Sequence, residues 1–308
     1  MKAIIINEFG PNPLTISETT TPQPAADQVL IRAHAAGLNP VDLGVRMGGF
    51  AEFMGHKPPL ALGFDVAGTV TAVGSTVSNF AAGDEVFAML PLSAPGALAE
   101  YVAAKAEHVA HKPAGLDFLQ TAAIPLAGLT AWQAIETANV QAGHRVIVHG
   151  ASGGVGSLAV QIARVKEATV FATASTRNQA YLQALGADRA IDYKTEAFDA
   201  IATDLDVVID LVGDSTQERS WACLKPGGFL ATVRGQPDAE RAAAHGVEAQ
   251  FVVVQPSGAG LAALAELVNR GELRVWLDGV YSLSDAESAF ARVGSGRVRG
   301  KVVVQIRS

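Results

Sequence analysis

Apolar residues follow two different periodicities along this chain of 308 residues, and the change falls near residue 116. The first part has short apolar runs separated by Gly, Pro and Asn, a pattern typical of strands and turns. These runs predict strands at 3–7, 28–36, 67–73, 85–89 and 99–103. Many short strands joined by turns indicate a compact, partly closed β domain.

From residue 116 onward, short apolar runs alternate with longer segments of helical periodicity. A helix is predicted over 119–139 with an interruption at Pro125, because proline lacks the backbone N–H and clashes inside a helix. Strands are predicted at 145–149, 169–174, 206–210 and 229–233, with helices between them at 155–166, 178–185 and 217–224. Strands separated by helices predict right-handed crossovers and a doubly wound parallel sheet.

The C-terminal part is expected to return to the β domain. Ser284 and Glu287 have the spacing of a capping box in front of a helical apolar face, and 301–306 is predicted as a closing strand. No further β-rich domain follows, so the α/β part is predicted to be an insertion. The expected division is a β domain over 1–115, an α/β domain over 116–255 and a return over 256–308.

A glycine turn lies between a predicted strand and a predicted helix in the segment HRVIVHGASGGVGSLAVQIAR, residues 144–164. A helix N-terminus presents unpaired N–H groups and roughly half a positive charge, which attract a pyrophosphate. Glycines permit the tight turn and the close approach of backbone to phosphate, although other doubly wound domains also contain glycine-rich turns. The predicted phosphate-binding residues are Gly150, Ser152, Gly153, Gly154, Val155 and Gly156.

The residues after the second strand of the α/β part indicate which dinucleotide binds. An NAD site usually has Asp or Glu at this point, about 20 residues after the glycine turn, to accept from the ribose 2′-hydroxyl. Here Ser175, Thr176 and Arg177 follow instead. Hydroxyls and a guanidinium suit a 2′-phosphate, so NADPH is predicted rather than NADH. Alternatively, Arg177 is only an exposed cation at a helix start, where it would oppose the helix dipole.

Composition and charge exclude several classes of function. The formal net charge of −7 disfavours nucleic-acid binding, and no apolar run approaches the roughly 18 residues of a membrane span. Cys223 is the only cysteine, which rules out an intrachain disulfide and is consistent with our expectation of a cytoplasmic location. Structural zinc needs a cluster of Cys or His ligands, and none is present, so no metal is expected.

Several motifs together resemble the medium-chain dehydrogenase/reductase superfamily, in its zinc-free quinone oxidoreductase-like branch. They are AAGLNPVD (35–42), PLALGFDVAGTVTAVG (59–74), GASGGVG (150–156), LGADRAIDY (185–193) and GKVVV (300–304). The resemblance implies a Rossmann NADPH-binding domain inserted into a GroES-like, partly closed β-barrel domain. It also implies hydride transfer from NADPH.

Two positions differ from the zinc alcohol dehydrogenases of the same superfamily. Asn39 stands where those enzymes carry a ligand cysteine, and Phe64 where they carry a ligand histidine. Without a Lewis acid to polarise the substrate, simple alcohol oxidation is disfavoured. A quinone, or a C=C bond conjugated to a carbonyl, is already electrophilic and needs mainly positioning. The expected substrate is therefore a quinone or an α,β-unsaturated carbonyl.

Asn39 is the candidate for positioning a substrate carbonyl or the cofactor through its amide, although a residue of an ordinary Asn-Pro turn would look the same. Asp42 and Arg46 are expected to form an ion pair that shapes this region. Relatives often carry an aromatic residue at Gly44, so a wider substrate pocket is expected. The resemblance also implies cofactor contacts from Thr130, Tyr193 and Lys301.

Two other functions remain open on sequence grounds. One is an enoyl-thioester or polyketide-type enoyl reductase, and the other is an NADPH-binding sensor with little catalysis, since no general acid is obvious. Relatives often form homodimers through the edge strand of the Rossmann sheet, here 250–255. Relatives also usually carry Gly where this chain has Glu167, so a weakened helix cap is expected there.

Overall fold

The computed structural model describes residues 1–49 and 51–307, which divide into two compact units. Unit 1 comprises 1–129, 255–271 and the chain from 275 onward, and unit 2 comprises 130–254 and 272–274. The first boundary lies later than the predicted residue 115. The reason is that the helix following residue 116 packs against strands of unit 1.

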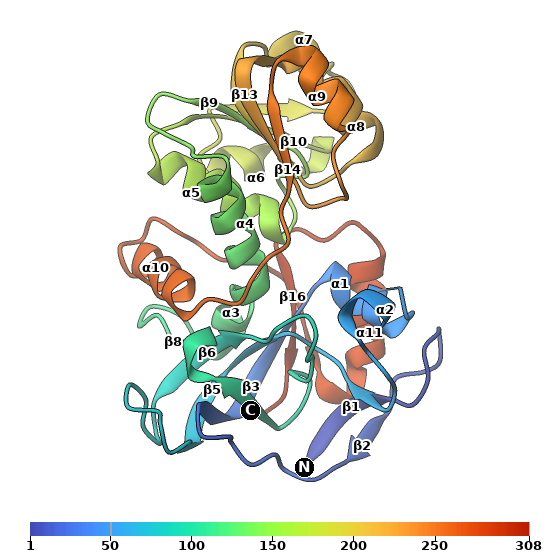
Figure 1. Cartoon of the computed structure of the whole chain (residues 1–308), viewed down its shortest axis with the longest axis vertical. Coiled ribbons are helices and arrows are strands. Elements are labelled where there is room, and N and C mark those ends of the chain that lie inside the picture. Colours follow the sequence, from blue (N-terminus) through green and yellow to red (C-terminus); the bar gives the residue numbers. More distant parts are fainter. Residues whose placement is uncertain (50, 308) are drawn as a thin grey trace. The chain divides into compact units, whose positions relative to one another are not determined.

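Unit 1 consists mainly of strands, drawn from blue to cyan and in red in Figure 1. Its strands are β1 (Lys2–Ile6), β2 (Ile16–Glu18), β3 (Gln28–Leu38), β4 (Leu60–Ala61), β5 (Asp65–Val73), β6 (Glu85–Met89), β7 (Tyr101–Lys105), β8 (Val109–His111), β15 (Leu277–Ser282) and β16 (Lys301–Gln305). Its helices are α1 (Pro40–Arg46), α2 (Ala51–Met54), α3 (Phe118–Ala122), α10 (Gly258–Asn269) and α11 (Ala286–Gly294). Helix α4 (Pro125–Thr137) begins in unit 1 and continues into unit 2.

The strands of unit 1 form a seven-stranded sheet in the order β15-β16-β3-β5-β6-β8, with β7 also paired to β3, and a three-stranded sheet β2-β1-β4. Strand β16 pairs antiparallel with β3 and parallel with β15. The C-terminal strand is thus an interior strand of the sheet that the N-terminal part begins. The strand-rich first unit confirms the predicted GroES-like β domain.

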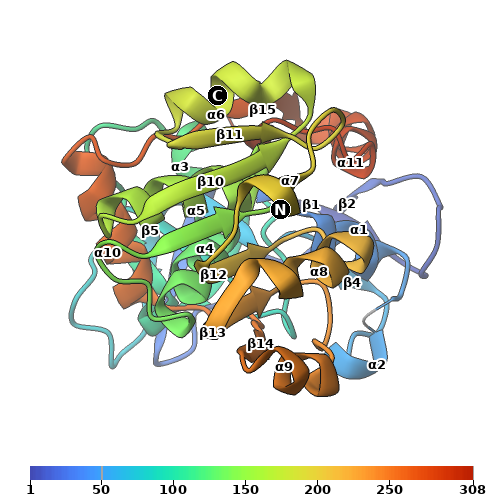
Figure 2. The same cartoon turned by 90° about the horizontal axis from the view of Figure 1, so that it is seen from above.

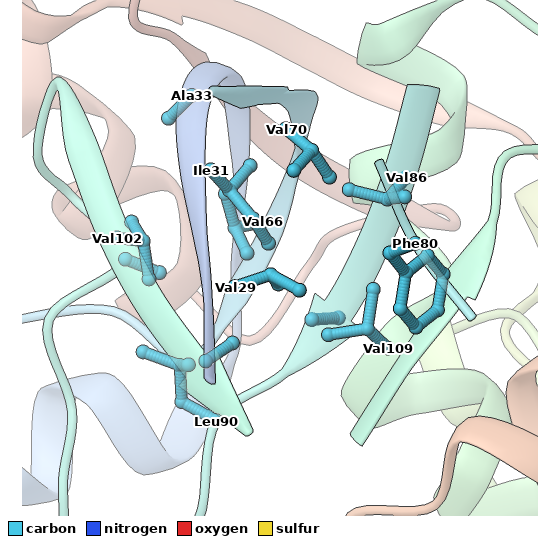
Figure 3. Close-up of a cluster of buried hydrophobic side chains, with 13 residues drawn as sticks. Val29, Ile31, Ala33, Val66, Val70, Phe80, Val86, Leu90, Val102 and Val109 are labelled. Carbon is cyan, nitrogen blue, oxygen red and sulfur yellow. The ribbon is translucent and has the colours of Figure 1, made fainter. Parts of the chain in front are cut away.

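Alternating side chains of this sheet form its hydrophobic core, shown in Figure 3. Val29, Ile31 and Ala33 are two residues apart on β3, so they point to the same face, and none is exposed. They pack with Val66 of β5 and Val86 of β6. Burial of each aliphatic side chain of this size contributes roughly 1.5–3 kcal/mol, so the cluster holds the strands together.

Unit 2 contains a six-stranded sheet with helices between the strands. The strands are β9 (Arg145–Val148), β10 (Thr169–Ala174), β11 (Arg189–Asp192), β12 (Leu205–Asp210), β13 (Leu224–Thr232) and β14 (Glu248–Phe251). The helices are α5 (Gly154–Val165), α6 (Gln179–Ala184), α7 (Phe198–Ile201), α8 (Asp214–Ser220) and α9 (Ala239–His245). Figure 2 looks onto this sheet from above.

The strand order in unit 2 is β11-β10-β9-β12-β13-β14, and every pair is parallel. In chain order this is 3-2-1-4-5-6, the arrangement of dinucleotide-binding sheets. Ile147 packs on one face with Phe198 and Trp221, and its neighbours on β9 point to the opposite face, where α5 contacts β9 and β10. The predicted doubly wound parallel sheet is confirmed. The order reverses at β9, so ligands are expected beyond the carboxyl ends of β9 and β12.

The predicted capping box at Ser284 is wrong. The helix α11 begins at Ala286, and the Ser284 hydroxyl contacts Ser282 at 2.8 Å. The Glu287 carboxylate accepts the backbone N–H of Leu14 and binds Arg46, so long-range partners occupy the group that would have capped the helix. None of the described helices is long and apolar enough to cross a membrane.

Glu167, just after α5, adopts the left-handed conformation with φ of 60°. Its carbonyl accepts the Gly143 N–H at 3.0 Å, and its N–H donates to the Arg164 carbonyl, so the conformation is fixed by the fold. We expect Glu167→Gly to raise the free energy of unfolding by about 0.5–1 kcal/mol, because only glycine adopts this conformation without a Cβ penalty. Urea denaturation measures the change. Glu167→Ala is the control, since alanine keeps the Cβ and should show no such gain.

Candidate functional site

The glycine turn of unit 2 leaves the first turn of α5 open. Helix α5 begins at Gly154, and its N-cap residue Gly153 offers no side chain to the first backbone N–H groups. Gly150 has φ of 68° and makes the turn after β9. A Cβ on Gly156 would lie 2.4 Å from the Gly150 carbonyl oxygen, so the helix packs directly on the turn. Glycine is therefore required at 156 for packing and at 150 for backbone conformation.

This turn fits the phosphates of a dinucleotide. A 12-residue helix with no capping side chain has N–H groups and a positive dipole end available to an anion. The turn follows β9, the strand at which the sheet order reverses. At Gly153 a Cβ would meet only the Gly150 carbonyl oxygen at 3.5 Å, so the remaining side is open. The predicted phosphate-binding residues 150–156 are therefore on one turn and one helix end.

The candidate residues for the adenosine end lie beyond two neighbouring strands. Ser175 follows β10 and is half-buried, and Arg177 is exposed on the 3-10 helix Thr176–Asn178. Tyr193 follows β11, is 57% exposed and donates its N–H to the Ala174 carbonyl at 3.3 Å. Because β10 and β11 pair in parallel with Ala174 opposite Asp192, the fold brings these side chains to the same end of the sheet.

One of the predicted hydroxyls is already engaged. The side chain of Thr176 donates to Asp192, and this hydrogen bond lowers the pKa of the Asp192 carboxyl. The backbone N–H of Lys194 adds a second hydrogen bond at 3.1 Å. The carboxylate of Asp192 is therefore held by its own loop, and the Thr176 hydroxyl orients it.

His149 lies directly before the glycine turn and was missed by the sequence reasoning. Its ring is fully buried, with Nδ1 3.1 Å from the Thr173 hydroxyl and Nε2 3.1 Å from the Ser220 hydroxyl. Ser220 donates its own hydrogen to the Thr216 carbonyl at 2.7 Å, so Nε2–H donates to Ser220 and Nδ1 accepts from Thr173. Burial lowers the pKa of His149 to about 4. The neutral imidazole thus connects the residue before the glycine turn to β10 and to α8.

Unit 1 contains a buried polar cluster that we define as Asn39, Asp42, Asp65 and Lys301. The Asn39 amide nitrogen donates to Asp65 Oδ2 at 2.8 Å, and its Oδ1 accepts from Lys301 Nζ at 2.6 Å. Lys301 also donates to the Leu38 carbonyl at 2.5 Å, and its Nζ lies 3.5 Å from Asp65 Oδ2. These contacts fix the orientation of the Asn39 amide from both sides.

The charges of the cluster are shielded from water. Asp65 and Asp42 are fully buried, and Lys301 is 5% exposed. Burial raises the pKa of Asp65 and lowers the pKa of Lys301, while their mutual attraction opposes both shifts. Asp65 Oδ1 additionally accepts the Leu126 N–H at 2.8 Å. Sequence reasoning had passed over Asp65, although a carboxylate at the start of an apolar strand was a visible signal.

Asp42, in the first turn of α1, accepts a hydrogen bond from the backbone of the N-cap residue Asn39. Its Oδ2 accepts the backbone N–H of Asn39 at 2.8 Å, whereas its buried Oδ1 has no hydrogen-bond partner. Burial raises the pKa of Asp42 to about 7, helped by the nearby Asp65 carboxylate and opposed by the Asn39 hydrogen bond and Lys301. The carboxyl is therefore poised to hold a proton near neutral pH.

The expected ion pair between Asp42 and Arg46 is wrong. The Arg46 guanidinium binds Glu287 of α11 at 2.9 Å and donates to the Asn12 carbonyl at 2.6 Å. It also lies over the Phe290 ring, 5.6 Å from the centroid. One helical turn separates residues 42 and 46, but the Asp42 carboxylate accepts the nearby Asn39 N–H while long-range partners take the Arg46 guanidinium. Arg46 therefore joins α1 to α11 and to the N-terminal loop.

The remaining predicted residues lie in different places. Thr130 is buried on α4, at the start of unit 2. Phe64 has no exposed surface, so the position where a zinc enzyme would have its histidine is occupied by buried hydrocarbon. Among residues 1–49 and 51–307, no group of three or more His, Cys, Asp or Glu side chains could hold a metal ion.

The raised pKa of Asp42 makes the stability of unit 1 depend on pH. The folded state binds a proton between the unfolded pKa of 3.8 and about 7, so this contribution is full below pH 4 and is lost as the pH rises through 7. In Asp42→Asn the amide imitates the protonated carboxyl and the loss disappears. The free energy of unfolding of the variant relative to the native chain should rise over this range by up to about 4 kcal/mol.

Denaturation with urea at pH 4 to 8 measures this difference. The control is Asp27→Asn, which changes an exposed carboxylate and should show no comparable trend. A flat difference between Asp42→Asn and the native chain would show that Asp42 is ionised throughout.

Both units contain segments that match known protein families. Residues 25–114 match the family described as alcohol dehydrogenase GroES-like domain, and residues 185–304 match the family described as zinc-binding dehydrogenase. A 2-methylene-furan-3-one reductase of Solanum lycopersicum is 38% identical over 300 residues, which cover 94% of this chain and 74% of that protein.

Two solved structures are similar over the whole fold. The quinone oxidoreductase from Coxiella burnetii has a TM-score of 0.92 and 39% identity, covering 100% of this chain and 99% of that one. The Escherichia coli quinone oxidoreductase complexed with NADPH has a TM-score of 0.88 and 26% identity, covering 99% of this chain and 100% of that one.

Proposed function

The chain belongs to the medium-chain dehydrogenase/reductase superfamily, and from this premise we propose that it transfers a hydride from NADPH to a quinone or an α,β-unsaturated carbonyl, without zinc. The nicotinamide supplies the hydride when the cofactor is bound. Similarity to a 2-methylene-furan-3-one reductase and to quinone oxidoreductases supports this class of acceptor. The protein's own residues bind the cofactor and orient the reactants.

The observation that carries the choice of NADPH is the end of β10. Ser175 and Arg177 follow this strand, where an NAD site would present a carboxylate. Tyr193 lies at the same end of the sheet, so the proposed 2′-phosphate site has a guanidinium and the hydroxyls of Ser175 and Tyr193. The Thr176 hydroxyl donates to Asp192, so we propose that this residue supports the site rather than donating to the phosphate. A guanidinium can bind phosphate through two parallel hydrogen bonds. The uncapped end of α5 is proposed to bind the pyrophosphate, and Thr130 is proposed as a further contact to the cofactor. Lys301, which was also expected to contact the cofactor, instead donates to the Leu38 carbonyl and to Asn39 Oδ1 and is 5% exposed.

Zinc independence rests on two side chains. Phe64 offers no donor atom, and both polar atoms of the Asn39 amide are engaged, by Asp65 and Lys301. We therefore propose that Asn39 positions the reactants as a member of a rigid cluster, together with Asp42. Arg46 is proposed to support this region through α11. Positioning alone can supply several kcal/mol of catalysis for an acceptor that is already electrophilic.

Turnover is tested by following NADPH absorbance at 340 nm with quinones, enones, an enoyl thioester and simple aldehydes. The proposal expects oxidation of NADPH with quinones or enones, unchanged by a chelator or by added zinc. Tight NADPH binding without turnover on any acceptor would instead favour a sensor. Activity that a chelator abolishes would contradict the absence of zinc.

Arg177→Ala tests the 2′-phosphate site. The variant should raise the Kd for NADPH by about 10- to 100-fold, because a charge-assisted hydrogen bond contributes about 1.5–3 kcal/mol. The Kd for NADH should change little, since NADH lacks the 2′-phosphate. Fluorescence titration gives both constants. Arg241→Ala is the control: Arg241 pairs with Glu218 on α8, and its helix α9 packs on β14, at the other edge of the sheet. An equal loss for both cofactors would contradict the assignment.

We further propose a homodimer and a cytoplasmic location. Strand β14 is an edge of the six-stranded sheet, which supports pairing between two copies. Of the predicted edge segment 250–255, only the first two residues belong to β14, and Val252 and Val254 are buried. Light scattering of the native protein and of Gln250→Pro tests the dimer.

The proposed cytoplasmic location has one supporting observation. Cys223 is buried, which fits a reducing compartment but does not require one.

A further inference from the structure

Asn178 connects the two ends of the proposed cofactor site in unit 2. Its side chain is 4% exposed at the end of the 3-10 helix Thr176–Asn178. The amide nitrogen donates to the Ser152 hydroxyl at 3.0 Å and to the Ser175 hydroxyl at 3.4 Å. Ser152 belongs to the glycine turn after β9, and Ser175 follows β10. A single buried amide thus contacts one hydroxyl from each phosphate region.

The backbone fixes the position of this amide. The Asn178 N–H donates to the Ser175 carbonyl at 2.8 Å, which places Asn178 at the start of α6. The next residue, Gln179, donates its side-chain nitrogen to the carbonyls of Ala174 and Ser175. Both amides therefore hold the end of β10, but Asn178 reaches hydroxyl groups and Gln179 reaches only carbonyl groups.

The direction of these hydrogen bonds decides what the serines can do. A hydroxyl group has one hydrogen to donate and two lone pairs that accept. Because the Asn178 amide nitrogen donates, the oxygens of Ser152 and Ser175 are acceptors in these contacts. Each serine keeps its hydrogen for another partner. A phosphate oxygen only accepts, so it requires that hydrogen.

We propose that Asn178 is a positioning residue that turns the hydroxyl hydrogens of Ser152 and Ser175 toward the phosphates of the dinucleotide. Ser152 then donates to the pyrophosphate and Ser175 to the 2′-phosphate. The amide couples the glycine turn to the residues that distinguish NADPH from NADH. This inference rests on the proposed function, since it presumes that NADPH binds at this end of the sheet.

Asn178→Asp tests the proposal with almost no change of shape. Both carboxylate oxygens accept, so the two serine hydroxyls turn inward and stop donating to phosphate. We expect the Kd for adenosine 2′,5′-bisphosphate, measured by calorimetry, to rise at least tenfold. In Gln183→Glu the same chemical change occurs on an exposed residue of α6, without touching a hydroxyl of the site. This control should raise the Kd by about threefold at most, as a general effect of one added negative charge.

A second comparison separates hydrogen-bond direction from charge. In a chain that carries Ser152→Ala and Ser175→Ala, the hydroxyls are absent, so Asn178→Asp should raise the Kd further by no more than the charge effect seen with Gln183→Glu. If Asn178→Asp weakens binding by the same factor with and without the two serines, Asn178 does not act through them. Equal losses of affinity for Asn178→Asp and Gln183→Glu would also overturn the inference. Thermal melting confirms that each variant is folded.

The two proposals fail in different ways. If the native chain binds neither NADPH nor adenosine 2′,5′-bisphosphate, the proposed function is wrong, and this inference is wrong with it. If the native chain binds both and Asn178→Asp binds them equally well, only the role of Asn178 is wrong.

Discussion

Gly156→Ala is expected to destabilise unit 2 and to abolish dinucleotide binding. The new Cβ would lie 2.4 Å from the Gly150 carbonyl oxygen and 2.6 Å from the Ala151 Cα. Both contacts are with backbone, so the start of α5 must move away from the turn. We expect a loss of about 3 kcal/mol in the free energy of unfolding, at the upper end for overpacking. Urea denaturation and NADPH titration measure the two effects.

Two further glycines serve as comparisons. Gly115→Ala should change neither quantity, because no atom lies within 4 Å of the added Cβ and the backbone is not left-handed. Gly153→Ala should leave stability nearly unchanged, since its Cβ meets only one atom, at 3.5 Å, yet it should weaken NADPH binding by crowding the phosphate. If Gly156→Ala binds NADPH normally, the close approach of α5 to the turn is not needed for the cofactor.

Lys301→Met is expected to destabilise unit 1 by about 3–5 kcal/mol, the usual cost of leaving a buried charge without its partner. The substitution removes the donor to the Leu38 carbonyl and to Asn39 Oδ1, and it leaves Asp65 without a nearby cation. Because the chain has two units, a single unfolding curve is ambiguous. Hydrogen exchange of peptides from β3 and β16 reports on unit 1 directly.

The double variant Lys301→Met, Asp65→Asn shows whether charge is the cause. Without either charge, the Asn39 amide can turn over and accept from the new amide at 65, so part of the lost stability should return. The contrary result is a loss of stability in the double variant that equals the sum of the losses in Lys301→Met and Asp65→Asn. That result would mean that the cluster is held by packing rather than by paired charges. A Lys301→Met loss below about 1 kcal/mol would contradict the buried pair altogether.

Periodic segments of this chain were predictable because their signals are local. Strand β10 occupies the predicted 169–174, and β6 occupies the predicted 85–89. Pro125 was expected to interrupt a helix, and the structure has two helices with α4 beginning at that residue. Apolar residues at a spacing of two, or of three and four, are enough to define such elements. The glycine turn was visible for the same reason.

Elements without regular spacing were harder to predict. A strand was expected to begin at Phe229, whereas β13 begins at Leu224 and includes Pro226 and two glycines. The structure includes Leu224, which pairs with Leu205, and the register shifts before Phe229 pairs with Val207. The short strands β2, β4 and β8 carry too few residues for alternation to be seen.

Long-range polar contacts could not be predicted. Asp42 and Arg46 have the spacing of an ion pair on one helix, but Arg46 binds Glu287, 241 positions away. Lys301 reaches Asn39, 262 positions away, and no local pattern carries that information. Sequence reasoning therefore identified Asn39 as a candidate but could not show that both of its amide atoms are engaged.

The position of β16 has a consequence for how the chain reaches this structure. All strands of unit 2 lie between residues 145 and 251, so that sheet can be completed while later residues are still being synthesised. The larger sheet of unit 1 has to wait, because β16 lies between β3 and β15 and is the last strand of the described chain. Until it arrives, the edge of β3 that β16 will cover is unpaired and open to association with other chains. The order of synthesis thus leaves this part of β3 uncovered until the last of the described strands has been made.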